Sequence, residues 1–472
     1  MAATRQNRRP TIDSVTTINE DGSRFFLHPE DAKGPITLIR RLIGWMLIAI
    51  YASLPWIQIN GYPAVFLDTL HRRFHLFGHI FSVQDVWLLF FCITGLGFTL
   101  FLLTALVGRV WCAFACPQTV FLEHVFRRIE RLIEGPPKER KRLDRLPWSD
   151  NEKLLKRGIK IGIFFVISAL IAHMFLAYFI SLPTLYSWMH ESPLEHWSSF
   201  LFVGIFTGIL FFNFTWFREQ LCIVICPYGR FQSVLIDDDT RVIGYDSKRG
   251  EPRGKGPGFG DCINCNKCVQ VCPTGIDIRQ GLQIECIACG SCADACDSVM
   301  DSIAKPKGLV RYDSLNALKG GKRRWFRPRL ALYGVFFLVG ACVATYSFSL
   351  LKPANFGVTR MRGNPYFVTD SHVRNQFQVR IVNKQHLDAH YTVEVVSANG
   401  EALDVQGAQE GFDVESMGEI ARPLIVMLDR EGYTGGFDAE VILHGESANG
   451  SPFTIEHPIK ILGPAPQLID QL

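Results

Sequence analysis

The sequence predicts a multi-domain membrane protein with a five-helix transmembrane bundle, a small cysteine-rich α+β domain in the cytoplasm and a C-terminal all-β sandwich. Three observations predict this architecture. The chain of 472 residues is 48% hydrophobic and contains 36 Phe, which is too apolar for one ordinary soluble domain. Eight of the 14 cysteines fall within residues 262–296. Beyond residue 353 the chain has no cysteine and consists of short alternating runs divided by Gly, Asn and Asp.

Five apolar stretches are long enough to cross a bilayer of about 30 Å. Basic clusters precede or separate them at Arg40–Arg41, Lys138–Arg145 and Lys322–Arg329. Because basic loops stay on the cytoplasmic side, we expect the N-terminus and the cysteine-rich domain inside and the C-terminus outside. Arg72–Arg73, in the first outer loop, is the exception. The predicted spans are about Leu42–Ile59, Val86–Val107, Ile159–Ile180, Phe200–Trp216 and Leu330–Leu351.

The spans divide the chain into five predicted segments. A polar N-terminus covers residues 1–41, four spans cover 42–236, the cysteine-rich domain covers 237–328, the fifth span covers 329–352 and the β-rich domain covers 353–472. The N-terminus has no apolar stretch that would predict a cleavable signal peptide. The net charge is only +4, and the basic clusters flank the spans. We therefore expect these charges to meet a lipid bilayer and not nucleic acid.

Between residues 262 and 296 the spacing C-x2-C-x2-C-x3-C occurs twice. This is the pattern of bacterial ferredoxins with two [4Fe–4S] clusters, in which the fourth cysteine of each run ligates the other cluster. Zinc and disulfides are the weaker alternatives, because zinc favours separated C-x2-C pairs and a reducing compartment disfavours disulfides. Pro273 follows the first run as expected, whereas Asp297 replaces the second proline. The predicted ligands are Cys262, Cys265, Cys268 and Cys296 for the first cluster, and Cys286, Cys289, Cys292 and Cys272 for the second.

The membrane part contains an internal repeat. GRVWCAFACPQTVF and REQLCIVICPYGRF, at residues 108–121 and 218–231, each close an apolar span and each contain C-x3-C-P. Within a helix the two cysteines of each motif would lie one turn apart. Four soft sulfur ligands suit Cu(I) better than Cu(II), although cysteines at helix ends are also common packing residues. The candidate copper or redox site is therefore Cys112, Cys116, Cys222 and Cys226.

Several other residues are weaker candidates. His71, His75 and His79 are spaced to share one helical face, where they would line a metal or quinone site or lie at the membrane interface. His173 lies inside the third span, where an ionisable side chain is either functional or bonded to a neighbouring helix. Cys92 and Cys342 lack partners at metal-ligand spacing and are expected to be packing residues.

The C-terminal segment has the alternation of half-buried strands. Phe377, Val379 and Ile381 alternate with polar residues, and residues 391–395 and 439–443 repeat the pattern. Such strands, divided by turn residues, predict a β-sandwich of roughly 100 residues.

Taken with RRFHLFG at Arg72–Gly78, these motifs resemble the FixG/RdxA family, to which the cytochrome c oxidase accessory protein CcoG belongs. The resemblance covers nearly the whole chain and implies that the C-terminal sandwich is immunoglobulin-like. It also implies a bacterial inner-membrane protein that reduces Cu(II) to Cu(I) during assembly of cbb3-type cytochrome c oxidase. Copper would be its substrate, and copper carriers, oxidase assembly factors and an unidentified electron donor would be its partners. A homodimer is left open.

Two other classes of function also fit the residues. The chain would be a quinol-oxidising electron-transfer subunit if His173 or the His71 face lay near a quinone. It would be a non-catalytic assembly scaffold if its clusters only sensed redox state. Reduction of the clusters by quinol, or a failure to reduce Cu(II), would separate these classes from a cupric reductase.

Overall fold

The computed structural model describes residues 17, 24–69, 73–82, 85–322, 324–407, 411–430, 433–465 and 467. The chain forms two compact units. The larger, which we call the membrane unit, comprises the residues up to 58, residues 63–67 and residues 89–345. The smaller, which we call the C-terminal unit, comprises residues 59–62, 68–88 and 346 onward.

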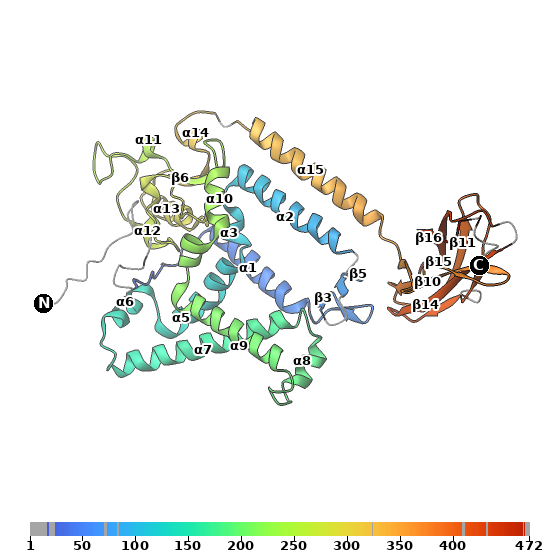
Figure 1. Ribbon diagram of the computed structural model, residues 1–472. Coiled ribbons are helices and arrows are strands. Elements are labelled where there is room, and N and C mark those ends of the chain that lie inside the picture. The colour runs from blue at the N-terminus through green and yellow to red at the C-terminus, as the bar shows by residue number, and fades with distance from the viewer. Residues whose placement is uncertain are drawn as a thin grey trace. The chain divides into compact units, whose positions relative to one another are not determined.

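Five of the helices in the described residues are long and apolar enough to cross a membrane, as the sequence predicted (Figure 1). The second and fifth agree closely with the predicted spans. The fourth ends in the π-helical turn η3 (Asn213–Phe217). The five helices are α1 (Pro35–Ser53), α2 (Val86–Val107), α7 (Asn151–Leu176), α9 (Trp197–Phe212) and α15 (Pro328–Ser349).

The first helix begins at Pro35, seven residues before the predicted start of the first span at Leu42. Pro35 occupies the first helical position, where its missing N–H leaves no bond unmade. The carboxylate of Asp294, in α13, accepts hydrogen bonds from the backbone N–H and the hydroxyl of Thr37, both at 2.7 Å. This contact provides the first turn of α1 with a hydrogen-bond acceptor from a distant part of the chain. It requires a glycine at position 34, because a Cβ there would lie 2.3 Å from Asp294 Cγ.

Short helices join the membrane spans to one another. Except for α8, which lies between the third and fourth spans, they lie between the second and third spans or after the fourth, around the two C-x3-C-P motifs. Their bounds are α3 (Val110–Phe114), α4 (Pro117–Phe121), η2 (Leu122–Phe126), α5 (Arg127–Glu134), α6 (Pro137–Arg145), α8 (Leu182–Trp188), η4 (Leu221–Ile225) and α10 (Pro227–Leu235).

The cysteine-rich segment is an α+β fold built around one antiparallel strand pair, β6 (Val242–Tyr245) with β7 (Val310–Asp313). Ile243, Ile278, Met300 and Leu309 are buried in its core together with several of the cysteines. The helices are short except α13. They are α11 (Ser247–Gly250), α12 (Lys267–Gln270), η5 (Ile278–Gln280), α13 (Ser291–Ser302) and α14 (Leu315–Leu318).

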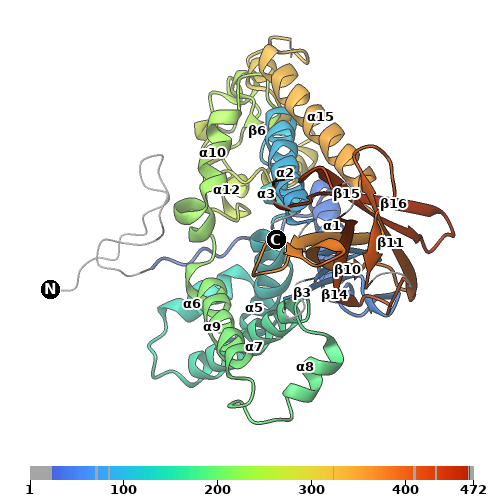
Figure 2. The ribbon, with the colours of Figure 1, turned by 45° about the vertical axis from the view of Figure 1, so that its right-hand side comes forward.

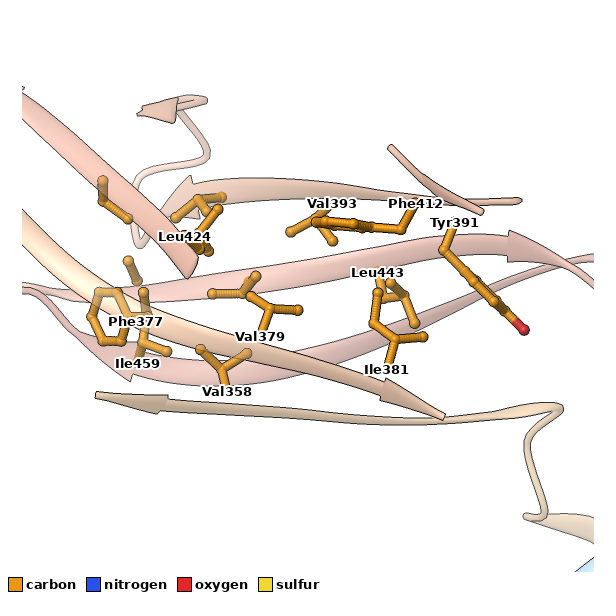
Figure 3. Packing of buried hydrophobic residues seen from close by; sticks show 14 of the residues in the cluster. Val358, Phe377, Val379, Ile381, Tyr391, Val393, Phe412, Leu424, Leu443 and Ile459 are labelled. Carbon is orange, nitrogen blue, oxygen red and sulfur yellow. The ribbon is translucent and has the colours of Figure 1, made fainter. Parts of the chain in front are cut away.

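The C-terminal unit contains two antiparallel sheets around one apolar core, seen in Figure 3. Phe377, Val379 and Ile381 are each at most 2% exposed, which confirms the predicted alternation. One sheet has the order β12-β14-β10-β8, with β9 added to β10, and the other has the order β13-β11-β15-β16. The strands are β8 (Ala354–Arg360), β9 (Phe367–Val368), β10 (His372–Asn383), β11 (Ala389–Ser397), β12 (Asp404–Gln406), β13 (Phe412–Val414), β14 (Glu419–Asp429), β15 (Asp438–Glu446) and β16 (Pro452–Lys460).

The loop after α1 forms strands and not the helix that the histidine spacing predicted. His75 lies in β4 (Arg73–Leu76) and His79 in β5 (His79–Ser82), so they do not share a helical face, and His71 lies outside the described residues. The His75 ring stacks on Tyr62 at 4.2 Å. The remaining strands of this loop are β1 (Gln58–Ile59), β2 (Tyr62–Pro63) and β3 (Val65–Asp68).

This loop also packs on the sandwich within the C-terminal unit. Lys384 Nζ lies 2.6 Å from the Asp85 carboxylate, and both side chains are at most 10% exposed. His386 Nε2 lies 3.0 Å from the carbonyl oxygen of Gly78. A buried ion pair of this kind ties the first loop to the C-terminal domain, a contact that the sequence did not predict.

Candidate functional site

The eight cysteines of the ferredoxin-type pattern line two cavities in the membrane unit. Cys272 lies in the wall of one cavity with the leading cysteines of the second run, against Ile278 and Ile287. Cys296 lies in the wall of the other with the leading cysteines of the first run. Cys268 borders both cavities. The last cysteine of each run is therefore placed with the other run, and each group of four thiols in an apolar wall fits a [4Fe–4S] cluster.

The loops between these cysteines share an uncommon backbone shape. Asn264 and Asn266 have positive φ angles in the first run, and Ala288 and Gly290 have them at the equivalent positions of the second. Left-handed residues that alternate with other conformations turn backbone N–H groups to one side of a loop. Consistent with this, the N–H of Ala288 donates to Cys286 Sγ at 3.4 Å. The repeated cysteine spacing thus corresponds to a repeated loop shape. In each loop, thiols and backbone N–H groups are directed toward the same cavity.

Arg279 supports the first of these loops, and the cysteine pattern gave no sign of it. Its guanidinium donates to the side-chain oxygens of Asn264 and Asn266, both at 2.7 Å, and it also pairs with Asp277 at 2.6 Å. Since both asparagines hold left-handed conformations, these bonds stabilise the strained loop between the cysteines.

Asp297 occupies an interior position of α13, which continues to Ser302. A proline at this point would remove a backbone donor and clash with the preceding turn. The Asp297 carboxylate instead accepts a hydrogen bond from the N–H of Gly308 at 2.8 Å. The departure from the ferredoxin pattern therefore lets the helix that carries Cys292 and Cys296 run on unbroken.

The two C-x3-C-P motifs do not place their cysteines one turn apart in a continuous helix, so that prediction was wrong. Cys116 and Cys226 both have extended backbones, with φ and ψ of −64° and 124° and of −63° and 111°. The following Pro117 and Pro227 explain this, because a residue before proline is driven out of the helical region. Each second cysteine therefore lies at the start of a new helix.

The repeat extends to the residue that begins each motif. Gly108 and Arg218 stand at equivalent positions, and both have positive φ angles, +69° and +49°. Gly108 has no room for a side chain, since a Cβ would lie 2.4 Å from the carbonyl oxygen of Arg241. A non-glycine residue is strained in this conformation. At Arg218 the strain is opposed by ion pairs of its side chain.

The first C-x3-C-P motif packs directly on the second ferredoxin run. Ala113, Ile287 and Cys289 form one buried cluster, with Cys112 and Phe114 packed against it. The cavity for the second predicted cluster is therefore immediately next to a membrane thiol. Figures 1 and 2 both place α3 beside α10 and the cysteine-rich segment.

Arg109, in the first C-x3-C-P segment, hydrogen-bonds to both the second C-x3-C-P segment and the ferredoxin-type domain. Its guanidinium donates to the carbonyl oxygen of Gly229, in the second C-x3-C-P motif, and to that of Ile284, two residues before Cys286. Nearby, Cys112 Sγ lies 3.4 Å from the Gln232 side-chain oxygen in α10. These contacts bring together both membrane motifs and the ferredoxin-type domain, although the motifs are more than 100 residues apart in the sequence.

The four membrane thiols are close enough to influence one another. Burial raises the pKa of Cys112 and of Cys222 to about 12, and the charges of Cys116 and Cys226 add to both shifts. Thiols in such a setting stay protonated until a cation replaces the proton. The arrangement therefore suits a soft metal ion better than a free thiolate.

A buried ion-pair network surrounds the two motifs. Glu130, with a side chain 2% exposed, lies 2.9 Å from Arg218, 3.2 Å from Arg140 and 3.3 Å from Lys160. Burial opposes its ionisation, yet the three cations hold the pKa of Glu130 well below its usual value. The network thus holds the strained start of the second motif against α5 and α7.

A second branch of this network reaches the ferredoxin-type domain. Arg127 is 3.1 Å from the Glu219 carboxylate and also donates to the carbonyl oxygen of Pro273, at 3.1 Å. Pro273 adjoins Cys272, so the branch ties the second C-x3-C-P motif to a predicted cluster ligand.

We expect Glu130→Gln to destabilise the membrane unit by about 3–5 kcal/mol, the usual cost of removing one partner from a buried ion pair. The amide keeps the shape of the side chain but leaves the charges of Arg218 and Arg140 without compensation, whereas Lys160 retains its contact with Glu134 at 2.6 Å. Thermal unfolding of the purified protein, followed by loss of cluster absorbance, measures the effect. The control is Glu139→Gln, because Glu139 pairs with Arg142 at the surface, where ion pairs contribute little to stability. Equal unfolding temperatures for both variants would contradict the structural role of Glu130.

The other histidine and cysteine candidates do not join this site. His173 Nδ1 lies 2.8 Å from the carbonyl oxygen of Ala169, one turn earlier in its own helix. Cys92 and Cys342 are exposed on α2 and α15, where lipid would surround a spanning helix.

Comparison with known proteins agrees with these motifs. A family model for 4Fe-4S dicluster domains matches residues 217–315, and a model for 4Fe-4S binding domains matches residues 87–136. A model for the immunoglobulin-like fold at the C-terminus of FixG matches residues 344–460. Protein RdxA of Cereibacter sphaeroides is 38% identical and covers 79% of this chain and 83% of its own length. The chain belongs to the FixG/RdxA family.

Further members of the FixG/RdxA family show similar relationships. Nitrogen fixation protein FixG of Rhizobium meliloti is 34% identical over 76% of each chain, and protein RdxB of Cereibacter sphaeroides is 35% identical over 80% of this chain and 83% of its own. A crystal structure of a FixG-related protein from Vibrio parahaemolyticus covers 24% of this chain and 97% of its own, with 21% identity and a TM-score of 0.19. As a member of this family, the protein is an iron–sulfur electron-transfer protein of the membrane.

Proposed function

We propose that this protein reduces Cu(II) to Cu(I) for assembly of a cbb3-type cytochrome c oxidase. The observation that carries the proposal is the packing of Cys112 and Ala113 against Ile287 and Cys289. It puts one candidate soft sulfur ligand, the Cys112 thiol, next to a predicted one-electron centre. Cu(II) needs one electron to become Cu(I), and thiol ligands favour the reduced ion.

The residues that would hold the iron–sulfur clusters are the two groups of four cysteines around the two cavities. When bound, [4Fe–4S] clusters supply one electron at a time. The protein's own part is to hold these cysteines in buried, apolar loops and to keep the nearer cavity against the membrane motifs. Arg109 and Arg127 do this through backbone carbonyls on both sides.

The copper substrate would bind at Cys112, Cys116, Cys222 and Cys226. In the described part of the chain no three of these sulfur atoms lie within 4.8 Å of one another. Three or four of them can therefore ligate one ion only if the motifs draw together. The extended backbones at Cys116 and Cys226, each between two helical segments, are the points at which we expect such a movement.

The reaction can be tested by anaerobic mixing. Protein reduced with dithionite and freed from excess reductant is mixed with Cu(II), while cluster absorbance and a Cu(I)-specific chelator are followed together. We expect one Cu(I) for each electron lost from the clusters. If the cluster absorbance stays bleached after Cu(II) is added, the clusters have stayed reduced, which would contradict the proposal and favour a scaffold. Reduction of the clusters by quinol would instead favour a quinol-oxidising subunit.

Iron analysis of the same sample tests where the metals bind. Two [4Fe–4S] clusters require about eight Fe per chain, and a third cluster on the membrane thiols would raise the content to about twelve. The match of residues 87–136 to a 4Fe-4S binding model makes this measurement necessary. We expect about eight.

We propose that the N-terminus and ferredoxin-type domain are cytoplasmic and that the C-terminal domain is periplasmic, where it would dock copper carriers or oxidase assembly factors. Support comes from the basic loops and from the packing of the first outer loop on the C-terminal domain through Asp85 and Lys384. The electron donor would then be cytoplasmic. No cysteine lies in the C-terminal domain, which favours docking over chemistry.

A reporter that is active only in the cytoplasm should therefore work when fused after Arg145 or Lys307 and fail after Leu472. The physical reason is that five spans place the two ends of the chain on opposite sides of the membrane. A periplasmic reporter supplies the control, because its activities should follow the reverse order. Cytoplasmic activity at Leu472 would rule out the five-span topology.

A further inference from the structure

A polar hollow in the membrane unit lies beside the cavity of the second predicted cluster. Part of its wall is Val271 and Ser291, which adjoin Cys272 and Cys292. It encloses about 20 Å³, room for a single water molecule. Its basic side chains come from three helices and are Arg40 and Arg41 of α1, His124 of η2, and Arg128 and Arg131 of α5.

Several of these basic groups are buried without a hydrogen-bond partner among the described residues. Arg40 is only 6% exposed, yet its Nε and Nη1 atoms have none, and its Nη2 atom is 3.7 Å from Glu123. The Nδ1 atom of His124 and the Nε atoms of Arg41 and Arg131 are likewise buried and have no hydrogen-bond partner among the described residues. Buried donors are normally satisfied, because a donor without a partner in the protein interior loses the hydrogen bonds that it makes to water.

Three carboxylates also line the hollow, and each pairs with a cation. Glu30 pairs with Lys267 and Glu123 with Arg127, both outside the hollow, while Asp31 pairs with Arg131 of the hollow itself. The charges of Arg40, Arg41 and Arg128 therefore exceed those of the carboxylates. The surroundings of His124 are accordingly positive, and burial together with the charge of Arg40 lowers the pKa of His124 to about 4. The ring is held in place by α1, since a Cβ at Gly44 would lie 2.2 Å from it. The hollow is therefore a rigid, electropositive recess with free donors.

We propose that this hollow binds a phosphate group. Guanidinium groups match phosphate oxygens in charge and in the geometry of their donors. The recess has room for one oxygen, while the rest of the group would lie at the mouth beside Arg128, whose side chain is 33% exposed. Arg40 and Arg41 lie near the cytoplasmic end of the first span in the proposed topology, where basic recesses between helices take anionic lipid headgroups. A free phosphate, or that of a soluble cofactor, has the same chemistry.

The test is a thermal-stability titration of the full-length protein, purified in neutral detergent, with two probes. One probe is inorganic phosphate, and the other is phosphatidylglycerol added in mixed micelles against phosphatidylcholine. We expect at least one of the anionic probes to raise the unfolding temperature to a plateau. A plateau with phosphate indicates a soluble source, and a plateau with phosphatidylglycerol alone indicates a lipid.

Variants decide whether the effect comes from the hollow. Arg41→Gln with Arg128→Gln should weaken the apparent affinity by about tenfold or more, since each change removes a charge-assisted hydrogen bond. Arg128→Gln alone, at a partly exposed site, should fold normally and give a smaller loss. The matched control is Lys141→Gln with Arg145→Gln, two exposed residues of α6. No plateau with either probe, or an equal plateau in pocket and control variants, would overturn the proposal, and neither result depends on copper reduction.

Discussion

Changing Cys112 and Cys116 to Ser, or Cys222 and Cys226 to Ser, should abolish most Cu(II) reduction while leaving the iron–sulfur spectra intact. Serine nearly keeps the size of the side chain but offers a hard oxygen donor, so affinity for Cu(I) should fall without a large cavity. Mutations of groups that only contact metal ligands typically lower metal affinity or activity by about 10–100-fold. The loss of two ligands should lower copper reduction by at least as much. The measurements are the rate of Cu(I) formation and the copper retained after desalting.

The matched control is Cys92→Ser with Cys342→Ser, which removes two exposed thiols from the same membrane unit. This variant should reduce copper at the normal rate. If a variant lacking all four motif cysteines still binds and reduces copper at that rate, with both clusters present, these residues only pack. The quinol-oxidising alternative would then become the better description.

Cys272→Ala should remove the cluster built on Cys286, Cys289 and Cys292, although Cys272 is nearer in sequence to the other three-cysteine run. Its thiol lines the cavity of the later run. A [4Fe–4S] cluster that loses one of four thiolates is usually unstable, so we expect about half of the iron to be lost. Electron paramagnetic resonance of the reduced protein should resolve which of the two centres remains.

The reciprocal variant is Cys296→Ala, whose thiol lines the cavity of the first run. It should remove the other centre and leave the one next to the membrane motifs. Since only that second centre lies against Cys112 and Ala113, copper reduction should depend on it more directly. Spectra in which each substitution removes the cluster adjacent in sequence would contradict the crossed assignment.

The parts of the protein that could be predicted from sequence are those encoded by local spacing. The eight cysteines follow a short repeat because a cluster demands thiols at fixed small separations, and the five apolar stretches follow from the thickness of a bilayer. The alternation at Phe377, Val379 and Ile381 reports a half-buried strand for the same reason, since side chains of a strand point to opposite faces. The FixG/RdxA resemblance rested on these local motifs and was confirmed.

Local spacing misled where a neighbouring residue or a distant contact changed the backbone. Proline after Cys116 and Cys226 breaks the helix in which the two cysteines of each motif were expected to lie one turn apart. Histidines spaced for a helix fall in strands β4 and β5, which pair with each other. The early start of α1 depends on Asp294, more than 250 residues away.

By itself, then, the sequence determined which segments are apolar enough to cross a membrane and which strands have a buried face, and it predicted which cysteines are cluster ligands. Only the tertiary structure decided that Arg109 bonds two motifs to the ferredoxin-type domain, that Glu130 pairs with the distant Arg218, and that one C-x3-C-P motif packs on the second cluster run. Such contacts join residues about 90 to 180 positions apart. They arise from side-chain packing and buried charge, which leave no periodic pattern or fixed residue spacing in the sequence.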